Sequence, residues 1–373
     1  MANNTARLGD LATYVNGYAF KPSDWGDTGL PIIRIQDLTG NSYQLNRYEG
    51  DYPARIEVND GDVLISWSAS LGVYVWQRGK ALLNQHIFKV VFDKLPINKD
   101  YFVFAVEHKL AEMESKTHGA TMKHIVKKDF DSTTIPYPAI EKQAEIAERL
   151  RRITALIEKQ KEQLLLLDQL VKSRFIELFG DPQSNPYGYQ YAKLSDIATY
   201  FNGLTYKPEN VAEEGTIVLR SSNIQNSQLD FADTVRVDCA IKERLMVQEN
   251  DILMCSRNGS AKLVGKVALI KGIQEPMSFG AFMMIIRSQY FGYLMTYFQM
   301  DAFRQQIKTG ATTTINQITG RMLDDVTIPL PPMALVDQFT AFIEQTDKSK
   351  LAVQQGLQEL EILKKSLMQQ YFG

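Results

Sequence analysis

The side chains with the clearest chemical potential in this sequence are polar groups suited to binding, and they recur in two halves of the chain. Arg34, followed by Gln36, has a counterpart in Arg220, followed by Ser222 and Asn223. Arginine, asparagine and glutamine can form paired hydrogen bonds with guanine or adenine edges, whereas lysine and threonine bind phosphate oxygens. This combination predicts contacts with double-stranded DNA. In the alternative interpretation, the arginines are structural and the glycine-containing segments are tight turns.

The candidate DNA-binding residues lie in four polar segments of each half. In the first half they are Tyr18, Lys21, Arg34, Gln36, Ser68, Ser70, Lys116, His118, Thr121 and Lys123. In the second half they are Tyr206, Lys207, Arg220, Ser222, Asn223, Arg257, Asn258, Lys308, Thr309, Thr312, Thr313 and Thr314.

Motifs for catalysis are missing from the sequence. It contains no GxxxxGK[ST] phosphate loop and no GxGxxG after an expected strand. Asn185-Pro186-Tyr187 is similar to part of the Asn-Pro-Pro-Tyr of adenine methyltransferases, but it lacks the second proline and lies in a linker-like segment. Cys239, Cys255 and the 4 histidines show no metal-ligand spacing. We therefore expect no catalytic residue, metal site or cofactor in this chain.

Composition limits where the protein works and how it could bind DNA. The 373 residues carry a net charge of −2, which gives little overall attraction to phosphates. A DNA-binding face would need charges segregated in three dimensions, or affinity supplied by partner subunits. No apolar run of about 18 residues predicts a membrane span, and MANNTARLGD lacks the pattern of a secretory signal. We expect a cytoplasmic protein with reduced cysteines and no membrane partner.

A long internal duplication organises these candidates. The segment LGDLATYVNGYAFKP (8–22) aligns with LSDIATYFNGLTYKP (194–208) at an offset of 186 residues, with nine of fifteen positions identical. The offset changes only slightly along the chain, as expected for one repeated fold with loops of different length. Further matches pair GLPIIRIQDL (29–38) with GTIVLRSSNI (215–224), GDVLIS (61–66) with NDILMC (250–255), THGAT (117–121) with KTGAT (308–312), and TIPYP (134–138) with TIPLP (327–331).

Each half ends in a segment with the periodicity of one long helix, and these two segments align without a gap. Apolar residues follow a heptad pattern in the first copy and a more interrupted one in the second, so the obvious partner of each helix is its own repeat. The expected seam residues are Ile146, Leu150, Ile153, Ile157, Leu164, Leu167, Val171 and Leu178, and then Phe339, Ile343, Val353, Leu357, Leu360 and Leu367. Thr346, Lys350 and Lys364 interrupt the second seam, as Gln160 and Arg174 interrupt the first.

The parts of the chain before these helices mix strand and helix signals, so the fold class predicted is α+β. The best helix candidates are 101–114 and 290–307. Expected strands are 31–35, 62–66, 87–92, 216–219, 251–254 and 282–286. Four parts follow: a globular domain at 1–138, a helical region at 139–180, a second domain at 181–331 and a second helical region at 332–373.

In this order, and present twice, the motifs resemble the specificity (S) subunit of Type I restriction–modification systems over essentially the whole chain. The resemblance is carried by NGYAFK and NGLTYK, PIIRIQDL, GDVLIS, GATMK and GATTT, IPYP and IPLPP, and LVKSRFIELFGDP. It implies two target recognition domains, each followed by a conserved helix, with the helices paired as an antiparallel coiled coil and related by a pseudo-twofold axis. Some relatives have a longer N-terminal segment, for which the C-terminal helix is expected to substitute.

The family resemblance also implies partners and a division of labour. Each recognition domain would read one half of a split, asymmetric DNA site, and the helices would set the spacing and dock two methyltransferase (M) subunits. S-adenosylmethionine would belong to the M partner, and ATP and Mg to restriction (R) subunits, with none held by this chain. Two alternatives are an enzyme, such as a single-chain restriction–modification protein, and a scaffold whose paired domains bind protein.

Overall fold

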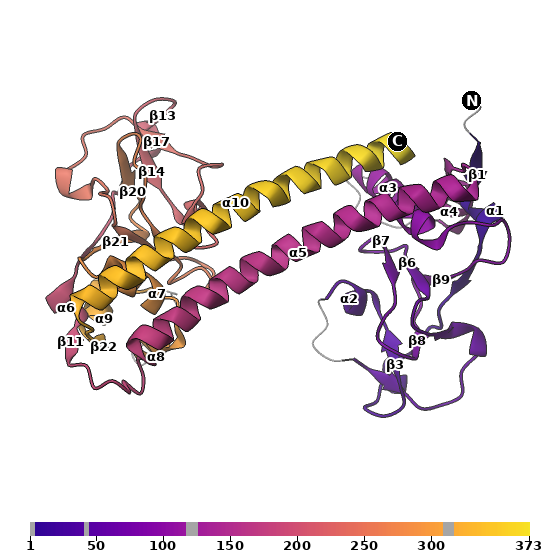
Figure 1. Cartoon of the computed structure of the whole chain (residues 1–373), viewed down its shortest axis with the longest axis horizontal. Helices are drawn as coiled ribbons and strands as arrows, with labels where there is room; N and C mark the ends of the chain where they lie inside the picture. The colour runs from indigo at the N-terminus through magenta and orange to yellow at the C-terminus, as the bar shows by residue number, and fades with distance from the viewer. Residues whose placement is uncertain (1–3, 41–44, 117–125, 309–316) are drawn as a thin grey trace. The chain divides into compact units, whose positions relative to one another are not determined.

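The computed structural model describes residues 4–40, 45–116, 126–308 and 317–373, which divide into two compact units. Unit 1 comprises Met1–Glu162 and Gln354–Gly373, and unit 2 comprises Gln163–Val353. Each unit therefore contains one globular repeat together with parts of two long helices, α5 (Ile140–Phe179) and α10 (Met333–Phe372) (Figure 1).

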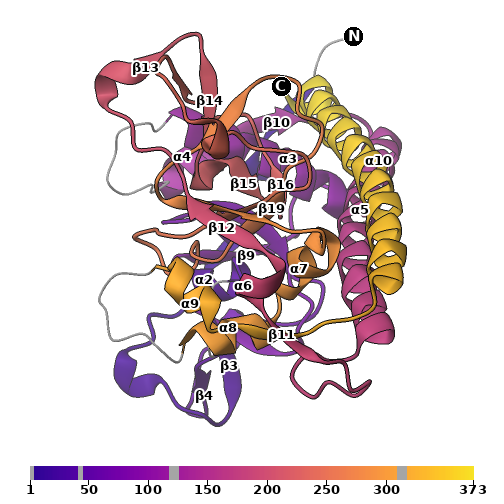
Figure 2. The ribbon, with the colours of Figure 1, turned by 90° about the vertical axis from the view of Figure 1, so that its left-hand side faces the viewer.

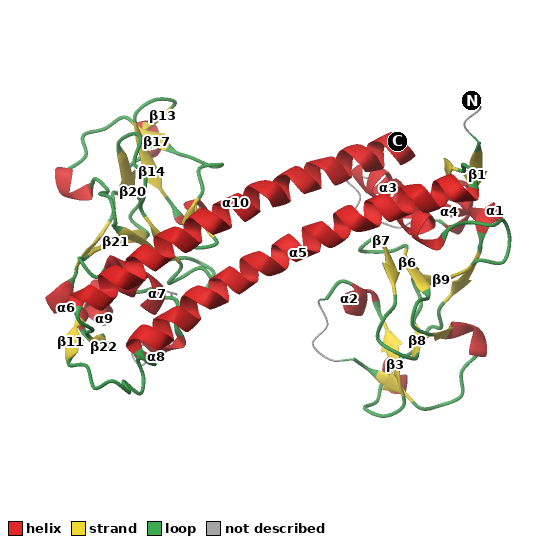
Figure 3. Cartoon of the chain, viewed as in Figure 1, coloured by secondary structure: helices red, strands yellow, loops and turns green. Residues whose placement is uncertain are grey.

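The globular parts are built from short strands and helices (Figure 3). In unit 1 these are β1 (Thr5–Arg7), α1 (Leu8–Leu11), β2 (Thr13–Asn16), β3 (Leu30–Ile33), α2 (Ile35–Leu38), β4 (Arg47–Tyr48), β5 (Glu57–Val58), β6 (Val63–Ser66), β7 (Gly72–Val75), β8 (Ala81–Leu83), β9 (Ile87–Val91), α3 (Lys99–Lys116), α4 (Lys127–Ser132) and β10 (Thr134–Pro136). In unit 2 they are β11 (Tyr191–Lys193), α6 (Leu194–Ile197), β12 (Thr199–Asn202), β13 (Val211–Ala212), β14 (Thr216–Leu219), β15 (Ile224–Gln225), β16 (Gln228–Leu229), β17 (Arg236–Val237), β18 (Ile252–Cys255), β19 (Val267–Leu269), β20 (Met277–Phe279), β21 (Met283–Arg287), α7 (Phe291–Tyr297), α8 (Asp301–Lys308), α9 (Gly320–Asp324) and β22 (Thr327–Pro329).

The two units repeat one sheet topology, which confirms the α+β class and the duplication read from the sequence. A four-stranded antiparallel sheet has the order β2-β9-β6-β7 in unit 1 and β12-β21-β18-β19 in unit 2. A second sheet in each unit contains one parallel pair, β3 with β8 and β14 with β20. The matching TIP segments pair with the first strand of each repeat, β10 with β1 and β22 with β11.

The central strands β6 and β18 show how each repeat builds two cores. Successive side chains of a strand point to opposite faces of its sheet. In β6, Val63 and Ile65 join the core that contains α3, whereas Leu64 joins the core around the parallel pair. In β18 the residues also alternate between two cores, with Met254 in one and Cys255 in the other. An uninterrupted apolar run thus predicts a strand that is covered on both faces.

Most expected elements are present, but the helix expected over 290–307 is wrong as a single element. It consists of α7 and α8, separated by a tight turn in which the amide of Gln299 donates to the Thr296 carbonyl at 3.1 Å. The turn brings the buried rings of Phe298 and Phe303 to 4.8 Å from each other. Aromatic packing therefore ends α7, a tertiary effect that the helical period could not show.

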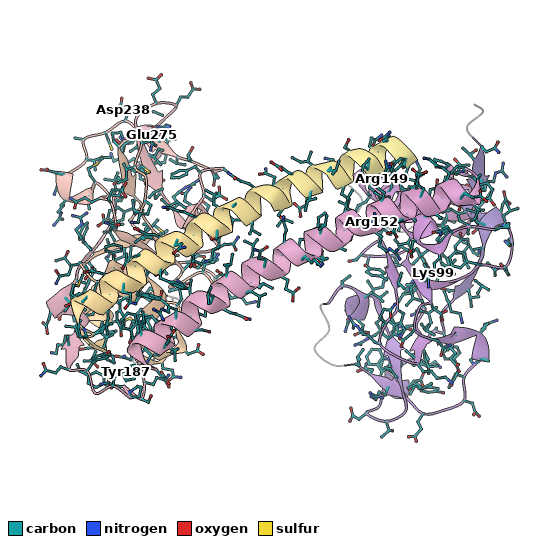
Figure 4. The ribbon with its side chains drawn as sticks, in the orientation of Figure 1. Lys99, Arg149, Arg152, Tyr187, Asp238 and Glu275 are labelled. Carbon is teal, nitrogen blue, oxygen red and sulfur yellow. The ribbon has the colours of Figure 1, made fainter. Side chains whose placement is uncertain are left out.

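Helices α5 and α10 are 40 residues long each and run antiparallel where they pack within each unit (Figures 1 and 2). In unit 1, Arg149, which Figure 4 labels, donates from Nη1 to the Tyr371 hydroxyl at 2.9 Å, and Lys161 lies 3.9 Å from Glu361. In unit 2, Lys350 forms an ion pair with Asp168 at 2.7 Å. As the residue numbers rise along α5, the numbers of their partners on α10 fall, as expected for antiparallel helices.

The expected seam residues of α5 are more deeply buried at one end than at the other, where Val171 and Leu178 still pack against the core of unit 2. Ile146, Leu150, Ile153 and Ile157 are buried, but Val171 and Leu178 are only half-buried. Phe175 and Phe179, outside the heptad pattern, are instead 0% and 2% exposed. A straight helix drifts from a strict seven-residue repeat, and here the drift turns these rings into the core of unit 2.

The three polar residues that interrupt the α10 seam each have a hydrogen-bond or ion-pair partner. The Thr346 hydroxyl donates to the carbonyl of Phe342, one turn earlier, at 2.9 Å. Lys350 is paired with Asp168, as above, and Lys364 lies 3.5 Å from Glu107. Because each group is paired, the seam tolerates these residues without leaving their polar atoms in an apolar surrounding.

Candidate nucleic-acid interface

Three segments of unit 2 meet at the chain between β20 and β21. The amide of Gly280 donates to the Leu219 carbonyl at 2.9 Å, at the end of β14, and Leu204 bridges to Gly280. The amide of Arg257 donates to the carbonyl of Phe282 at 3.0 Å. Residues 280–282, here called the junction segment of unit 2, therefore hold together three of the polar segments that the sequence singled out.

Unit 1 has the same arrangement around residues 84–86, its junction segment. Tyr18 bridges to Asn84, whose amide donates to the Ile33 carbonyl at 3.2 Å, just before Arg34. The amide of Trp67 donates to the His86 carbonyl at 3.3 Å. The two repeats therefore present corresponding loops at one backbone framework, although most of the loop side chains differ.

The repeated Asn-Gly pair is explained by this junction. The amide of Gly17 donates to the carbonyl of Ile87, and a Cβ atom on Gly17 would overlap the backbone of Asn84. A Cβ on Gly203 would likewise overlap the carbonyls of Phe279 and Gly280. Glycine is required because the two backbones approach too closely for any side chain. These glycines therefore allow the loop after β2 or β12 to pack against its junction segment.

Replacing Gly203 with alanine is expected to destabilise unit 2, because only movement of the backbone could make room for the added methyl group. The expected loss is at least about 2 kcal/mol of unfolding free energy, in the range of strained or overpacked substitutions. Chemical denaturation of the purified chain would measure it. Gly259→Ala is the matched control, since a Cβ there meets no described atom within 4 Å. Equal stability of both variants would contradict this explanation.

The junction segment of unit 2 borders a cavity of about 840 Å³. Four residues expected from the sequence line it together: Tyr206, Arg220, Arg257 and Asn258. They come from three different loops, and the exposed ring of Phe282 stands beside them. A concave site that collects arginine, amide and aromatic side chains can bind nucleic-acid bases and phosphates by hydrogen bonding and stacking.

The expected polar residues of the cavity, and Asn223 in the loop that follows Arg220, differ in how available they are. Arg220 donates from Nη2 to Asp233 at 2.7 Å, so its charge is already neutralised. Asn223 is 1% exposed, and its amide bonds the backbone of Arg220, Asp230 and Asp233. This burial assigns Asn223 to holding its loop. Asn258 reaches the Ser221 hydroxyl at 3.3 Å and also shapes its own loop.

Two further arginines of unit 2 are bound to carboxylates. Arg236 pairs with Glu275, labelled in Figure 4, at 2.6 Å, and this hydrogen bond raises the pKa of the Arg236 guanidinium. Arg287 binds buried Asp251 at 2.7 Å, which raises the pKa of Arg287 in the same way. Arg257 is different, because its side chain is exposed and forms no ion pair with the residues that the structure describes. Its guanidinium lies 5.3 Å from the ring centre of Phe282.

In unit 1 the corresponding residues lie beside aromatic rings. Tyr18 is 43% exposed with its ring 5.0 Å from Phe20, and the guanidinium of Arg34 lies 5.4 Å from the ring centre of Trp25. Arg34 is also 3.6 Å from buried Asp37. Lys21 is exposed in a loop, and Gln36 is exposed on α2.

The loop of unit 1 that carries Ser68 and Ser70 is closed by a buried hydroxyl. Ser66 Oγ donates to the Ser70 carbonyl at 2.6 Å, which leaves Ser68 half-buried and Ser70 exposed. Beside this loop, the rings of Trp67 and His86 lie 5.0 Å apart. By the shared backbone bonds, Trp67 corresponds to Ser256, Ser68 to Arg257, and His86 to Phe282.

Several expected residues lie elsewhere. His118, Thr121, Lys123, Thr309, Thr312, Thr313 and Thr314 are outside the described residues, and Lys116 and Lys308 are the last residues of α3 and α8. Lys207 and Ser222 are exposed, with Lys207 3.2 Å from Glu209. Gln317, the first described residue after the second Gly-Ala-Thr motif, bridges to Arg257. Gln317 therefore lies beside a residue that lines the cavity.

Sequence reasoning missed Phe282 and the role of both junction segments. The signal available was the polar or aromatic residue that precedes each apolar run, His86 before β9 and Phe282 before β21. The role of His86 and Phe282 follows only from their backbone hydrogen bonds to loops that are distant in sequence. Trp67 was visible only as part of a serine-rich segment, although its ring is packed against His86 and Phe88.

Two other features bear on function. Within the described ranges, no three histidine, cysteine or acidic side chains are grouped as metal ligands would be. Cys255 is buried, and burial raises the pKa of its thiol, whereas Cys239 is half-buried. None of the helices in the described parts of the chain has the length and apolar character needed to cross a membrane.

Comparison with known proteins identifies relatives of both repeats. The chain is similar to the Type I restriction enzyme EcoBI specificity subunit of Escherichia coli, with 24% identity over 303 residues, covering 73% of this chain and 62% of that protein. It therefore spans less than two thirds of the length of the EcoBI subunit. The MjaVIII specificity subunit of Methanocaldococcus jannaschii is 22% identical, with 97% of this chain and 90% of that protein covered.

Solved structures share the fold. The S subunit of a Type I restriction–modification system from M. genitalium superposes with a TM-score of 0.59 at 14% identity, covering 99% of this chain and 96% of that chain. A chain from a structure on complex assembly and conformational transition of the type I R-M system gives 0.58 at 16% identity, with 99% and 97% covered. The family model described as Type I restriction modification DNA specificity domain matches residues 3–167 and 186–361. Both repeats, and nearly all of the sequence, thus place this chain in the Type I restriction modification DNA specificity domain family.

Proposed function

We propose that this chain is the DNA-reading subunit of a Type I restriction–modification complex, with each recognition domain binding one half of a split, asymmetric site. One observation carries the proposal: the same backbone junction is built twice and fitted with different side chains. Trp67, Ser68 and His86 stand where the second copy has Ser256, Arg257 and Phe282. A common framework with unlike contact residues is what reading two unlike half-sites requires.

The proposed division of the chain follows its repeat. Residues 1–138 and 181–331 are the recognition domains, and 139–180 and 332–373 are the helical regions that set the spacing and dock partners. The pseudo-twofold relation of the two halves stays a prediction. The chain carries no catalytic residue in this proposal: S-adenosylmethionine belongs to the M subunits, and ATP and Mg belong to the R subunits.

The long helices expose a duplicated surface that suits docking. Leu170 and Ser173 of α5 align with Leu363 and Ser366 of α10, and each pair lies one turn apart on its helix. These four residues are here called the docking face. Leu170 is 48% exposed and Leu363 is 46% exposed, so neither is needed for packing within its unit. Two identical exposed surfaces, one in each compact unit, would bind two copies of one partner, the M subunit.

The net charge of −2 supports a dependence on partners. Neutralising several DNA phosphates needs clustered cations, and three arginines of unit 2, Arg220, Arg236 and Arg287, are paired with carboxylates. We propose that the M subunits supply much of the phosphate binding, while the loops of this chain supply the choice of bases.

Exchange of residues 8–138 for the corresponding domain of another family member tests the assignment of reading to the domains. In cells that carry the chain with its M subunit, methylome sequencing is expected to show one altered half-site and one unchanged half-site. A change in both halves, or in neither, would rule out one domain per half-site. Methyl transfer by the purified chain alone would contradict its non-catalytic role, and binding without sequence preference would favour a scaffold.

A further inference from the structure

We propose that Arg257 reads a guanine in the half-site bound by the second recognition domain, with Phe282 holding its guanidinium in place. The proposal rests on the proposed function and names the residue and the base chemistry at that site. It is carried by the availability of Arg257, by its stacking on an exposed ring, and by its position at the cavity beside the junction segment.

Availability separates Arg257 from its neighbour Arg220. Both line the cavity, but Arg220 donates to Asp233 at 2.7 Å and would have to give up that carboxylate to bind a base. Arg257 is exposed and forms no ion pair with any described residue. Its donors can therefore reach a guanine without breaking an existing bond.

The contact with Phe282 orients the donors. The guanidinium lies 5.3 Å from the ring centre, within the range of cation–π attraction. Stacking covers a flat face of the guanidinium and leaves the N–H groups at its edge free to form hydrogen bonds. Phe282 is 60% exposed, so its ring is accessible for stacking on the guanidinium. The ring restricts the arginine before DNA arrives and so lowers the entropy lost on binding.

The backbone fixes both residues relative to the fold. The amides of Ser256 and Arg257 donate to the carbonyl of Phe282 at 2.9 Å and 3.0 Å. Arg257 also bridges to Gln317, so three chain segments define its position. A base-reading residue must be held in this way, because a bidentate bond to the O6 and N7 atoms of guanine requires both donors to be in register.

The first domain makes a different choice at the same place. Ser68 occupies the position of Arg257, and the ring of Trp67 packs at 5.0 Å from His86, the counterpart of Phe282. A serine cannot form the forked bond of an arginine. The guanine assigned to Arg257 therefore belongs to the second half-site alone, and substitutions at 257 should leave the first half-site unchanged.

The test uses the full chain assembled with its M subunit and a pool of DNA duplexes randomised over both half-sites. Bound duplexes are sequenced for the wild type and for Arg257→Ala, Arg257→Lys and Phe282→Leu. Arg244→Ala is the matched control, since Arg244 is an exposed arginine of the same domain that does not line the cavity. Circular dichroism and co-elution with the M subunit verify that each variant is folded and assembled.

For Arg257→Ala we expect about a tenfold to hundredfold loss of preference for guanine at one base pair of the second half-site. Lysine should restore overall binding more than the preference, because it keeps the charge without the fork. Phe282→Leu should weaken the same preference to a smaller extent, and Arg244→Ala should leave it intact. A uniform loss over all sequences would make Arg257 a phosphate contact and overturn the proposal, as would unchanged preferences. Absence of any preference in the wild type would instead overturn the proposed function.

Discussion

If the proposed docking of M subunits is correct, replacing Leu170 and Leu363 together with glutamate is expected to abolish it. Each substitution places a carboxylate at the centre of an apolar contact, where an unpaired charge is strongly unfavourable. Because few residues dominate most interfaces, each substitution should weaken its contact at least about a hundredfold. Either single variant should retain one M subunit, since the two leucines lie in different compact units. Native mass spectrometry of the co-expressed proteins would count the subunits.

Leu165→Glu is the matched control for this prediction. Leu165 is 63% exposed on α5, and the aligned residue of α10 is Gln358, so its surface is not duplicated. The same chemical change there should leave two M subunits bound. If Leu165→Glu removed an M subunit and the double variant did not, the docking face would be misassigned. Thermal unfolding of each variant would separate lost docking from lost folding.

The duplication made the fold predictable from the sequence. Two copies of each pattern reduce chance matches, and strands such as β6 and β18 were recognisable because they are short apolar runs between turn signals. The long helices were recognisable for the same reason: apolar residues at helical spacing persist over many turns. Both patterns involve residues that are close together in the sequence, so they can be recognised without knowledge of the tertiary structure.

What could not be predicted depends on segments that are distant in sequence. Phe175 and Phe179 lie outside the heptad pattern, yet they are buried by Tyr293 and Phe339. Asn223 resembled a base-reading amide, but its burial is decided by the backbone of Asp230 and Asp233. Phe282 became significant only when pairing placed it beside Arg257.

For the candidate residues, the sequence shows the type of each side chain but not whether that side chain is free to bind a ligand. Arg34, Arg220 and Arg257 look alike as arginines in polar loops. The structure distinguishes them by their neighbours: Asp37 beside the first, Asp233 beside the second, and an aromatic ring beside the third. Asp37 is only three residues from Arg34, but Asp233 is 13 residues from Arg220, so a local spacing rule could not have found that partner.

Phe372→Ala is expected to destabilise unit 1 selectively, although Phe372 lies at the far end of the sequence from the first domain. Its ring is 1% exposed and lies 5.2 Å from Tyr101, in the same core as Ile146 and Leu150. Removing a buried phenylalanine ring leaves a cavity and lowers the free energy of unfolding by about 3–5 kcal/mol. Hydrogen exchange measured by mass spectrometry should show faster exchange in α3 and little change in α7.

The corresponding experiment in unit 2 supplies the control. Phe179 is equivalent to Phe372 in the repeat, and its ring lies 5.0 Å from Tyr293. Phe179→Ala should reverse the pattern, with faster exchange in α7 and protection kept in α3, while Phe372→Leu should restore most of the stability of unit 1. Equal destabilisation of both units by either variant would show that they unfold together. Selective loss would mean that the end of each long helix completes the core beneath a reading domain.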